Sequence, residues 1–291
     1  MMERRLIINA DDLGMTRGIN LAVSECADFG MLRSTSLIAN GDAFDDAVKS
    51  VKERDGFGTG IHFALTGFKP LLPAEKLSGF VRPHGLMPSG PGELLWKLAV
   101  HKTPPDAIRK ELFAQAERVF DAGITPTHFD SHKHVHIIPA VLDIIIEIAE
   151  RFSVRWVREP FEPGGAWRFL SDLGNDRRTF VRQFAKARVS IAARPIFRRR
   201  VREAGIRTPA GLYGISCTGL TNEKIIERIC KTLKPGLSEL MTHPGIVDED
   251  LIRRKSRLLY SRAKEKDLLL STKVRELFRE HEITLGYFGG P

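Results

Sequence analysis

The chain has 291 residues, of which 42% are hydrophobic, so it can bury a sizeable core without stabilisation by disulfides. Its three cysteines form no CxxC pair and no even set, which favours reduced thiols in a cytoplasmic protein. No stretch approaches the ~20 apolar residues of a membrane span. The N-terminal sequence "MMERRLIINADD" has only a short apolar run before charged residues follow, unlike a signal peptide. We therefore expect neither export nor membrane spanning.

The formal net charge of +9 is concentrated in one segment. Residues 176–207 hold eleven Lys and Arg against two Asp and Glu, whereas the rest of the chain has 34 of each sign. A general polyanion binder more often spreads its charge, and this segment carries no zinc-finger, RNA-binding or helix-turn-helix signature. Nucleic acid is therefore not an expected partner, and the segment is interpreted as one basic, partly amphipathic element.

The first third of the chain predicts alternating strands and helices. Apolar runs predict strands over 4–9, 34–40 and 57–65, with a helix from about Arg17 to Gly30 and another over 42–53. Residues 66–103 then carry Gly and Pro repeatedly. A connection of this length usually has a function, so we expect this long loop insertion to cover a site.

The same alternation continues to the end of the chain. A helix from Pro104 to a glycine stop at 123 is followed by a fourth strand, "TPTHFD", and by the apolar helix that Pro139 opens. Further strands are predicted over 153–159, 211–217, 238–243 and 283–288, and further helices around 221–234 and 249–280. Eight strands in this alternation predict an α/β fold, a distorted (β/α) TIM-like barrel forming a single domain over 1–291. A doubly wound open sheet is the alternative.

Aspartate and histidine lie at or just beyond the C-terminal ends of four predicted strands, where a barrel assembles its site. These residues are Asp11 and Asp12 in "NADDLG", His62 in "GIHF", the cluster His128, Asp130, His132, His134 and His136 in "THFDSHKHVH", and His243 in "THPG". Alternating histidines in front of a buried helix have no packing rationale, which favours a functional role for the cluster.

A mononuclear hydrolytic metal site needs about three protein ligands and an open position. Asp12, His62 and one histidine of the cluster supply such a set. Asp11 could then act as general base on metal-activated water, and His243 could protonate the leaving group. These residues also have ordinary explanations: Asp11 and Asp12 could form a turn, and His62 and His243 could each be a structural residue.

Four motifs, "NADDLG", "GIHFALT", "THFDSHKHVH" and "THPG", resemble in order and spacing the YdjC-like carbohydrate deacetylases, which include chitooligosaccharide deacetylases. The match runs from the first strand to about residue 245. The resemblance implies a distorted (β/α) barrel, one divalent metal ion and hydrolytic removal of acetyl from an N-acetylated sugar. It also implies roles by residue: Asp12, His62 and His132 as metal ligands, Asp11 as base, His243 as acid, and His128, Asp130, His134 and His136 as residues that contact substrate or support the site.

Two imidazoles and one carboxylate suit zinc, whereas magnesium is associated with this family. A phosphoesterase or amidohydrolase on a similar barrel is the nearest alternative function. Many such enzymes place an HxH pair directly after the first strand, whereas this chain has two aspartates there. A noncatalytic sugar-binding barrel is the alternative if the ligands are not assembled.

Three further stretches, "VREPFEP", "FRRRVREAGIRT" and "GLTNEKI", resemble the branch of the family associated with hopanoid biosynthesis. This resemblance implies an N-acetylglucosaminyl hopanoid lipid as substrate. The basic segment 176–207 would then make a peripheral membrane contact, at roughly 1 kcal/mol per well-placed basic residue on anionic headgroups. A solvated helix pair or an oligomer contact, as in a homodimer, is the alternative explanation of the segment.

Overall fold

The structure, a computed structural model, describes residues 3–52, 54–77 and 79–290. Its sheet has the strand order β4-β3-β2-β1-β6-β5, with β7 also paired to β1, and all of these pairs are parallel. The strands are β1 (Arg4–Leu13), β2 (Ser34–Leu37), β3 (Gly58–Phe63), β4 (Phe129–Ser131), β5 (Leu212–Tyr213), β6 (Gly236–Thr242) and β7 (Ile283–Gly286).

Strand β1 lies at the centre of this sheet and is long enough to pair with two strands, β7 and β2, along one edge. Residues 4–7 pair with β7, and the stretch from Asn9 to Leu13 pairs with β2. Strand β6 lies along the other edge. The last eight of the ten residues of β1 are buried, as expected for a parallel strand that is covered on both faces.

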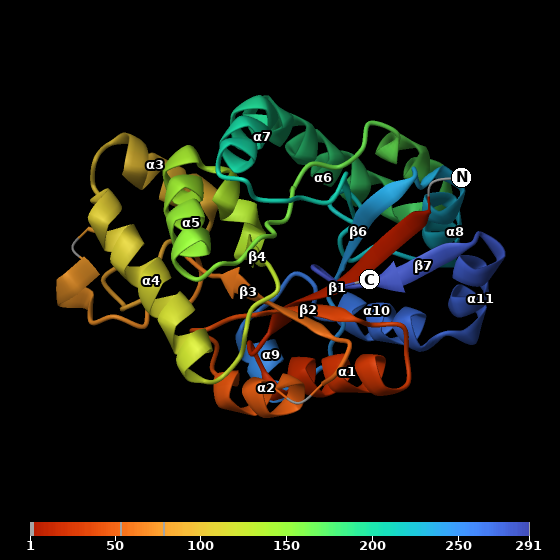
Figure 1. The fold of residues 1–291 in the computed structure, drawn as a ribbon, viewed down its shortest axis with the longest axis horizontal. Coiled ribbons are helices and arrows are strands. Elements are labelled where there is room, and N and C mark those ends of the chain that lie inside the picture. Colours follow the sequence, from red (N-terminus) through yellow and green to blue (C-terminus); the bar gives the residue numbers. More distant parts are fainter. Residues whose placement is uncertain (1–2, 53, 78, 291) are drawn as a thin grey trace.

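The strands curl into a distorted barrel (Figure 1). Isolated bridges close its ring. Phe129 of β4 bridges to Val157, and Trp156 bridges to Arg207. From Arg207 the chain continues into β5, which pairs with β6. The predicted (β/α) barrel is therefore confirmed, and its ring is completed by bridges rather than by an eighth regular strand.

Over 153–159 the structure has no regular strand, since only Trp156 and Val157 form bridges, and of the strand predicted over 211–217 only Leu212 and Tyr213 form a strand. The carbonyl of Arg158 accepts a hydrogen bond from His136 Nε2, at 3.1 Å, instead of from a neighbouring strand. Pro160 comes directly after the predicted strand, and its backbone nitrogen has no N–H to donate. A side-chain contact and a proline therefore end the ladder here.

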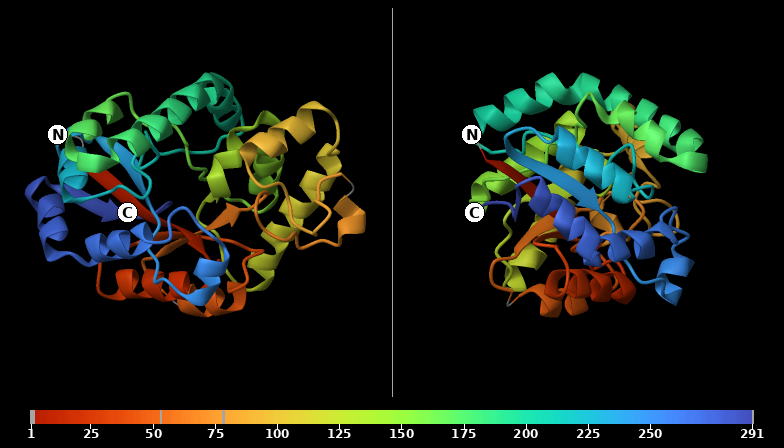
Figure 2. Two further views of the ribbon diagram at one scale, coloured as in Figure 1. Left: turned by 180° about the vertical axis from the view of Figure 1, so that it is seen from behind. Right: turned by 90° about the vertical axis from the view of Figure 1, so that its right-hand side faces the viewer.

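Helices surround the strands (Figures 1 and 2). Those that the sequence predicted are α1 (Arg17–Asp28), α2 (Phe44–Val51), α4 (Pro105–Asp121), α5 (Pro139–Arg151) and α8 (Glu223–Thr232). Glu53, the end of the second predicted helix, lies outside the described residues. The region 249–280 forms three helices, α9 (Glu249–Arg253), α10 (Ser261–Leu270) and α11 (Thr272–Glu280), and the basic segment forms α6 (Arg177–Ser190) and α7 (Arg194–Glu203). Among the helices that the structure describes, none is long and apolar enough to cross a membrane.

The insertion between β3 and α4 has more structure than the predicted loop. It contains a 3-10 turn, Ala74–Leu77, and a helix, α3 (Pro91–Ala99). Its apolar side chains Leu77, Phe80, Met87 and Leu94 are fully buried. The insertion therefore packs into the same hydrophobic core as the barrel, which holds it in place over the strand ends.

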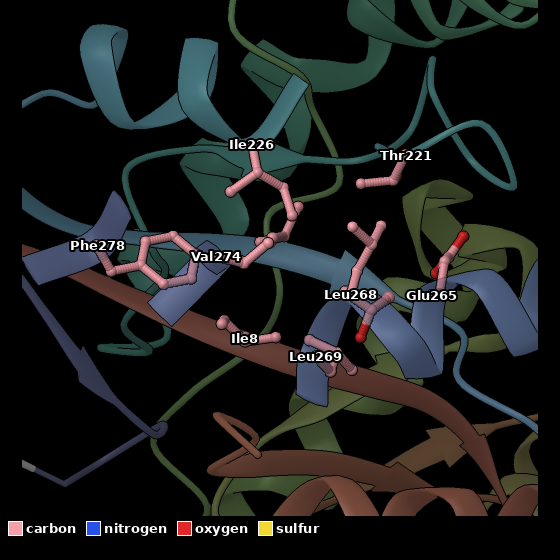
Figure 3. Close-up of a pocket in the computed structure, with 10 residues that line it drawn as sticks. Ile8, Thr221, Ile226, Glu265, Leu268, Leu269, Val274 and Phe278 are labelled. Carbon is pink, nitrogen blue, oxygen red and sulfur yellow. The ribbon is translucent and has the colours of Figure 1, made fainter. Parts of the chain in front are cut away.

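Behind β1 and β6 the barrel packs against helices through aliphatic and aromatic side chains (Figure 3). The hollow that remains there has a volume of about 10 Å³, room for at most one water-sized sphere. Glu265 of α10 lies at its edge and accepts hydrogen bonds from the backbone N–H groups of His243 and Gly219. This region is packed core, and Glu265 ties it to the end of β6, where His243 lies.

Candidate metal centre and active site

Asp11 and Asp12 line the same cavity although neighbours in a strand normally point to opposite faces. The register of β1 against β2 shifts between Ala10 and Leu13, and Asp12 has a φ of 71°, in the left-handed region. A bulge of this kind re-aims side chains and is common next to active sites. It allows both aspartates of the motif to reach one site.

The three predicted metal ligands come together at the ends of β1, β3 and β4. One ligand atom from each of Asp12, His62 and His132 lies within 4.8 Å of the others. Asp12 Oδ1 is 3.0 Å from His132 Nδ1 and 3.6 Å from His62 Nε2. Asp12 and His62 are buried, whereas His132 is partly exposed toward the cavity. One carboxylate and two imidazoles fit a divalent ion that keeps an open coordination position.

A carboxylate behind His62 fixes the orientation of its ring. His62 Nδ1 lies 2.8 Å from Asp130 Oδ1, which leaves Nε2 directed toward Asp12. Metal-binding histidines typically have such a carboxylate partner. Burial lowers the pKa of His62, but the carboxylates of Asp130 and Asp11 outweigh it and raise the pKa to about 9. At neutral pH His62 therefore carries a proton, which a metal ion bound by this ring would have to displace.

Arg158, to which the sequence motifs gave no role, organises the acidic side chains. It is fully buried and donates to both oxygens of Asp11, at 2.6 and 2.7 Å, and its guanidinium also lies 2.8 Å from Asp130 and 2.6 Å from Glu239. Burial raises the pKa of Asp11, but the positive charges of Arg158 and His62 together outweigh burial and lower this pKa. Asp11 is therefore ionised at neutral pH. The one sign of Arg158 in the sequence was that an arginine at this position interrupts the apolar residues of the predicted strand "SVRWVRE".

A second set of side chains, Asp11, His62 and Asp130, also brings ligand atoms within 4.8 Å of one another. The guanidinium of Arg158 already bonds to both of these carboxylates. A cation placed among them would be repelled by this guanidinium and would compete with it for the same oxygens. The set built on Asp12 is therefore the better metal centre.

Two histidines of the cluster, His128 and His136, support the site from behind and do not line the cavity. His128 Nε2 lies 3.1 Å from Ser36 Oγ, and this hydroxyl donates to Asp130 at 2.9 Å. His136 Nδ1 lies 2.6 Å from Ser131 Oγ, and its Nε2 reaches the Arg158 carbonyl. Burial lowers the pKa of His128 to about 3 and that of His136 to about 4, so both are neutral.

His134, by contrast, lines the cavity beside His132. Lys133 and His134 have φ values of 56° and 55°, in the left-handed region that non-glycine residues seldom adopt. This strained turn presents all three consecutive side chains to the cavity. Burial lowers the pKa of His134 to about 3, so its ring is neutral at neutral pH.

His243 lines the cavity at the end of β6. Its backbone N–H donates to Glu265 Oε2 at 2.6 Å, and its Nδ1 lies 3.8 Å from the same oxygen. Among the described residues this Nδ1 is buried without a hydrogen-bond partner. The structure therefore places His243 on the same cavity as Asp11 and Asp12, as the sequence motifs predicted.

The site opens into a cavity of about 1210 Å³, large enough for an oligosaccharide. The insertion contributes Gly67, Phe68, Arg82, Met87 and Ser89 to its wall, so this segment covers the site as predicted. Helix α6 contributes one of its faces, with Thr179, Arg182, Gln183, Lys186 and Ser190. Part of the positive charge of the basic segment is thus directed at the cavity.

Arg158→Met should lower the unfolding free energy by about 3–5 kcal/mol at neutral pH, because it leaves buried carboxylates without their cation. The folded-state pKa values of Asp11 and Asp130 lie below the ordinary value, so these groups stabilise the fold at neutral pH, and the contribution is lost on acidification. In the variant both carboxylates can take up protons, so its deficit should shrink as the pH falls. Denaturant unfolding at pH 7.5 and 4.5 measures both effects.

Arg200→Met is the matched control for this change. Arg200 forms an ion pair with Asp143 in which both side chains are partly exposed, so its loss should cost about 1 kcal/mol or less. Equal stability of Arg158→Met and the wild type at pH 7.5 would show that the buried cluster has no such dependence on Arg158.

A distorted parallel α/β barrel with buried Asp and His side chains converging at its strand ends is the architecture of a barrel enzyme. The family model described as "YdjC-like protein" matches residues 5–280. The chain belongs to this family.

Its relatives extend along the whole chain. It is 31% identical over 294 residues to a chitooligosaccharide deacetylase of Salmonella paratyphi B, covering 99% of each chain. It is 28% identical to a carbohydrate deacetylase of Thermoanaerobacter pseudethanolicus, covering 96% of each. Among solved structures, a protein of Enterococcus faecalis V583 has the same fold, with a TM-score of 0.77, 21% identity and 98% coverage of each chain.

Proposed function

We propose that this protein is a metal-dependent carbohydrate N-deacetylase, which hydrolyses the acetamide of an N-acetylated sugar. The observation that carries this proposal is the meeting of Asp12, His62 and His132, with Asp11 on the same cavity. The names of the relatives, carbohydrate deacetylase and chitooligosaccharide deacetylase, support the same reaction. The volume of the cavity is consistent with a sugar larger than one ring.

In this proposal Asp12 Oδ1, His62 Nε2 and His132 Nδ1 hold a divalent ion, zinc or magnesium. When bound, such an ion lowers the pKa of water and polarises a carbonyl group. Asp11, kept ionised by Arg158, accepts a proton from the attacking water. His243 gives a proton to the amine nitrogen as the C–N bond breaks. The products are acetate and the free amino sugar.

Acetate release from a substrate panel tests the proposal. The protein is stripped with a chelator, reloaded with Zn²⁺ or Mg²⁺, and mixed with N-acetylglucosamine oligosaccharides, lipid-linked N-acetylglucosaminides and phosphate esters. We expect acetate to appear only after reloading, with a matching loss of one acetyl mass from the sugar. Release of phosphate without acetate would favour the phosphoesterase alternative, and release of neither would reject the proposal.

The basic segment is proposed to contact anionic membranes through its outer surface. Its helices expose Val181, Val189 and Ile196, at 51, 78 and 43%, among arginines, which is typical of a helix at a membrane surface. Some of its charge is used inside the protein, since Arg194 and Arg198 pair with the buried Glu159. The contact therefore depends on the remaining outward-facing arginines.

Cosedimentation with vesicles at physiological salt checks this contact. We expect the wild type to bind vesicles that contain anionic lipid and not purely zwitterionic ones, and Val189→Asp to bind more weakly because it places a negative charge on the contacting surface. Leu21→Asp, at an exposed position on α1, is the control and should bind as the wild type does. Wild-type protein that stays in the supernatant with anionic vesicles would reject the contact.

A further inference from the structure

Arg262, in the first turn of α10, is a buried cation next to the candidate metal centre. Its side chain is only 1% exposed, and its guanidinium donates a hydrogen bond to Asp12 Oδ2. The two residues are 250 positions apart in the sequence. Buried arginine is rare unless it is paired, so the contact with Asp12 is the main reason for this side chain to lie here.

The two oxygens of Asp12 have different partners. Oδ2 accepts the hydrogen bond from Arg262, whereas Oδ1 faces the imidazoles, 3.0 Å from His132 Nδ1 and 3.6 Å from His62 Nε2. We propose that Arg262 is a positioning residue that keeps Asp12 a one-oxygen metal ligand. This inference rests on the metal centre of the proposed function and assigns a task to a residue outside its ligands and acid–base groups.

The number of oxygens that Asp12 contributes matters for catalysis. A carboxylate can bind a metal through one oxygen or through both, and the second oxygen occupies a further coordination position. A catalytic site has to keep such a position open for water and for the carbonyl that is attacked. By holding Oδ2, Arg262 leaves this position free and fixes the direction of Oδ1.

The "THPG" motif makes room for Arg262. A Cβ atom at Gly245 would lie 2.9 Å from Arg262 Cδ and 3.1 Å from its Cβ, too close for an ordinary contact. The backbone N–H of Gly245 also donates to the Arg262 carbonyl at 3.2 Å. The motif therefore serves the site twice, because His243 lines the cavity and Gly245 allows the arginine stem to pass.

The guanidinium nitrogens of Arg262 that do not contact Asp12 indicate that this residue does more than stabilise the fold. Within the described residues, Arg262 Nε and one terminal nitrogen are buried without a hydrogen-bond partner. Buried donors are normally satisfied, and an ion pair retained only for stability would be expected to satisfy them. Arg262 lines the cavity together with Asp12, so its unusual environment belongs to the site.

Spectroscopy of the Co²⁺-loaded protein tests this role, because the visible bands of Co²⁺ report the number and geometry of its ligands. Three variants are compared with the wild type: Arg262→Met, which removes the donor at similar volume, Arg262→Lys, which keeps the charge and a donor, and Gly245→Ala, which displaces the arginine stem. Arg253→Met, at an exposed ion pair on α9, is the control. Circular dichroism and thermal melting of the metal-free proteins establish that each variant is folded.

We expect Arg262→Met to shift the Co²⁺ bands and to lower the kcat for deacetylation by about 10–100-fold at saturating metal. Arg262→Lys should restore turnover to within about tenfold of the wild type, and Arg253→Met should match the wild type. If Arg262→Met does not fold, Gly245→Ala must show the shifted bands. Unshifted bands in the folded variant overturn the role of Arg262, whatever happens to turnover. Wild-type protein that takes up none of Co²⁺, Zn²⁺ and Mg²⁺ rejects the metal centre itself.

Discussion

Asp12→Ala is expected to lose the metal ion and to reduce acetate release by at least about 10³-fold. Asp12 is the only carboxylate among the three ligands that the structure brings together, so its loss leaves two imidazoles to hold a divalent cation. The ion contributes several kcal/mol of transition-state stabilisation, and each 1.36 kcal/mol corresponds to a factor of about ten in rate. Metal content after gel filtration and acetate release measure the two effects on the same sample.

Asp45→Ala is the matched control for this change. Asp45 also belongs to an Asp–Asp pair, but its side chain is 87% exposed in α2. It should retain wild-type metal content and turnover. Asp12→Ala also deprives the buried Arg262 of its partner, so thermal melting must show that the variant is folded. A folded Asp12→Ala protein with full metal content would reject the ligand assignment.

Much of the barrel could be predicted from the sequence because its elements are local patterns. The strands around residues 4–9, 34–40 and 57–65 are short apolar runs bounded by polar residues or glycine, and the structure has β1, β2 and β3 there. The closure of the ring was not visible in the same way. At 153–159 the pattern is that of a strand, but the Arg158 carbonyl is engaged by His136, 22 residues earlier in the chain, and no local pattern reports that contact.

The insertion shows a related limit. Its Gly and Pro content correctly indicated a break in the alternation and a cover for the site. The same residues concealed the helix α3, because Pro91 is favourable in a first turn although it breaks a helix elsewhere. Four buried apolar side chains, and not helix propensity, then hold this segment on the core.

The candidate site was predictable as far as its motifs reach. Adjacent aspartates and alternating histidines are visible in the sequence, and the structure gathers Asp12, His62 and His132. The sequence could not show which histidines line the cavity and which support it from behind. That difference depends on the left-handed turn at residues 133–134, where the sequence has no glycine or asparagine to indicate such a turn. It also gave no role to Arg158 and Arg262, because their partners lie up to 250 residues away.

Asp11→Asn is expected to reduce turnover by about 10²–10⁴-fold while leaving the metal bound, because general base catalysis contributes that much and Asp11 is not among the three ligands. Asparagine keeps the shape of the side chain but cannot accept the proton. The KM for the sugar should change little, since the lost interaction belongs to the transition state. Steady-state kinetics and metal content are measured on the same preparation.

The pH dependence separates a base from a merely structural aspartate. Arg158 lowers the pKa of Asp11, so wild-type activity should persist below neutral pH before protonation of this carboxylate removes the base. Measured at saturating metal, the residual activity of Asp11→Asn should lack that acidic limb, and Asp45→Asn should keep the wild-type profile. Turnover of Asp11→Asn within about threefold of the wild type would assign proton removal to another group, and His134 would then be the next candidate, because it lines the same cavity and is neutral at working pH.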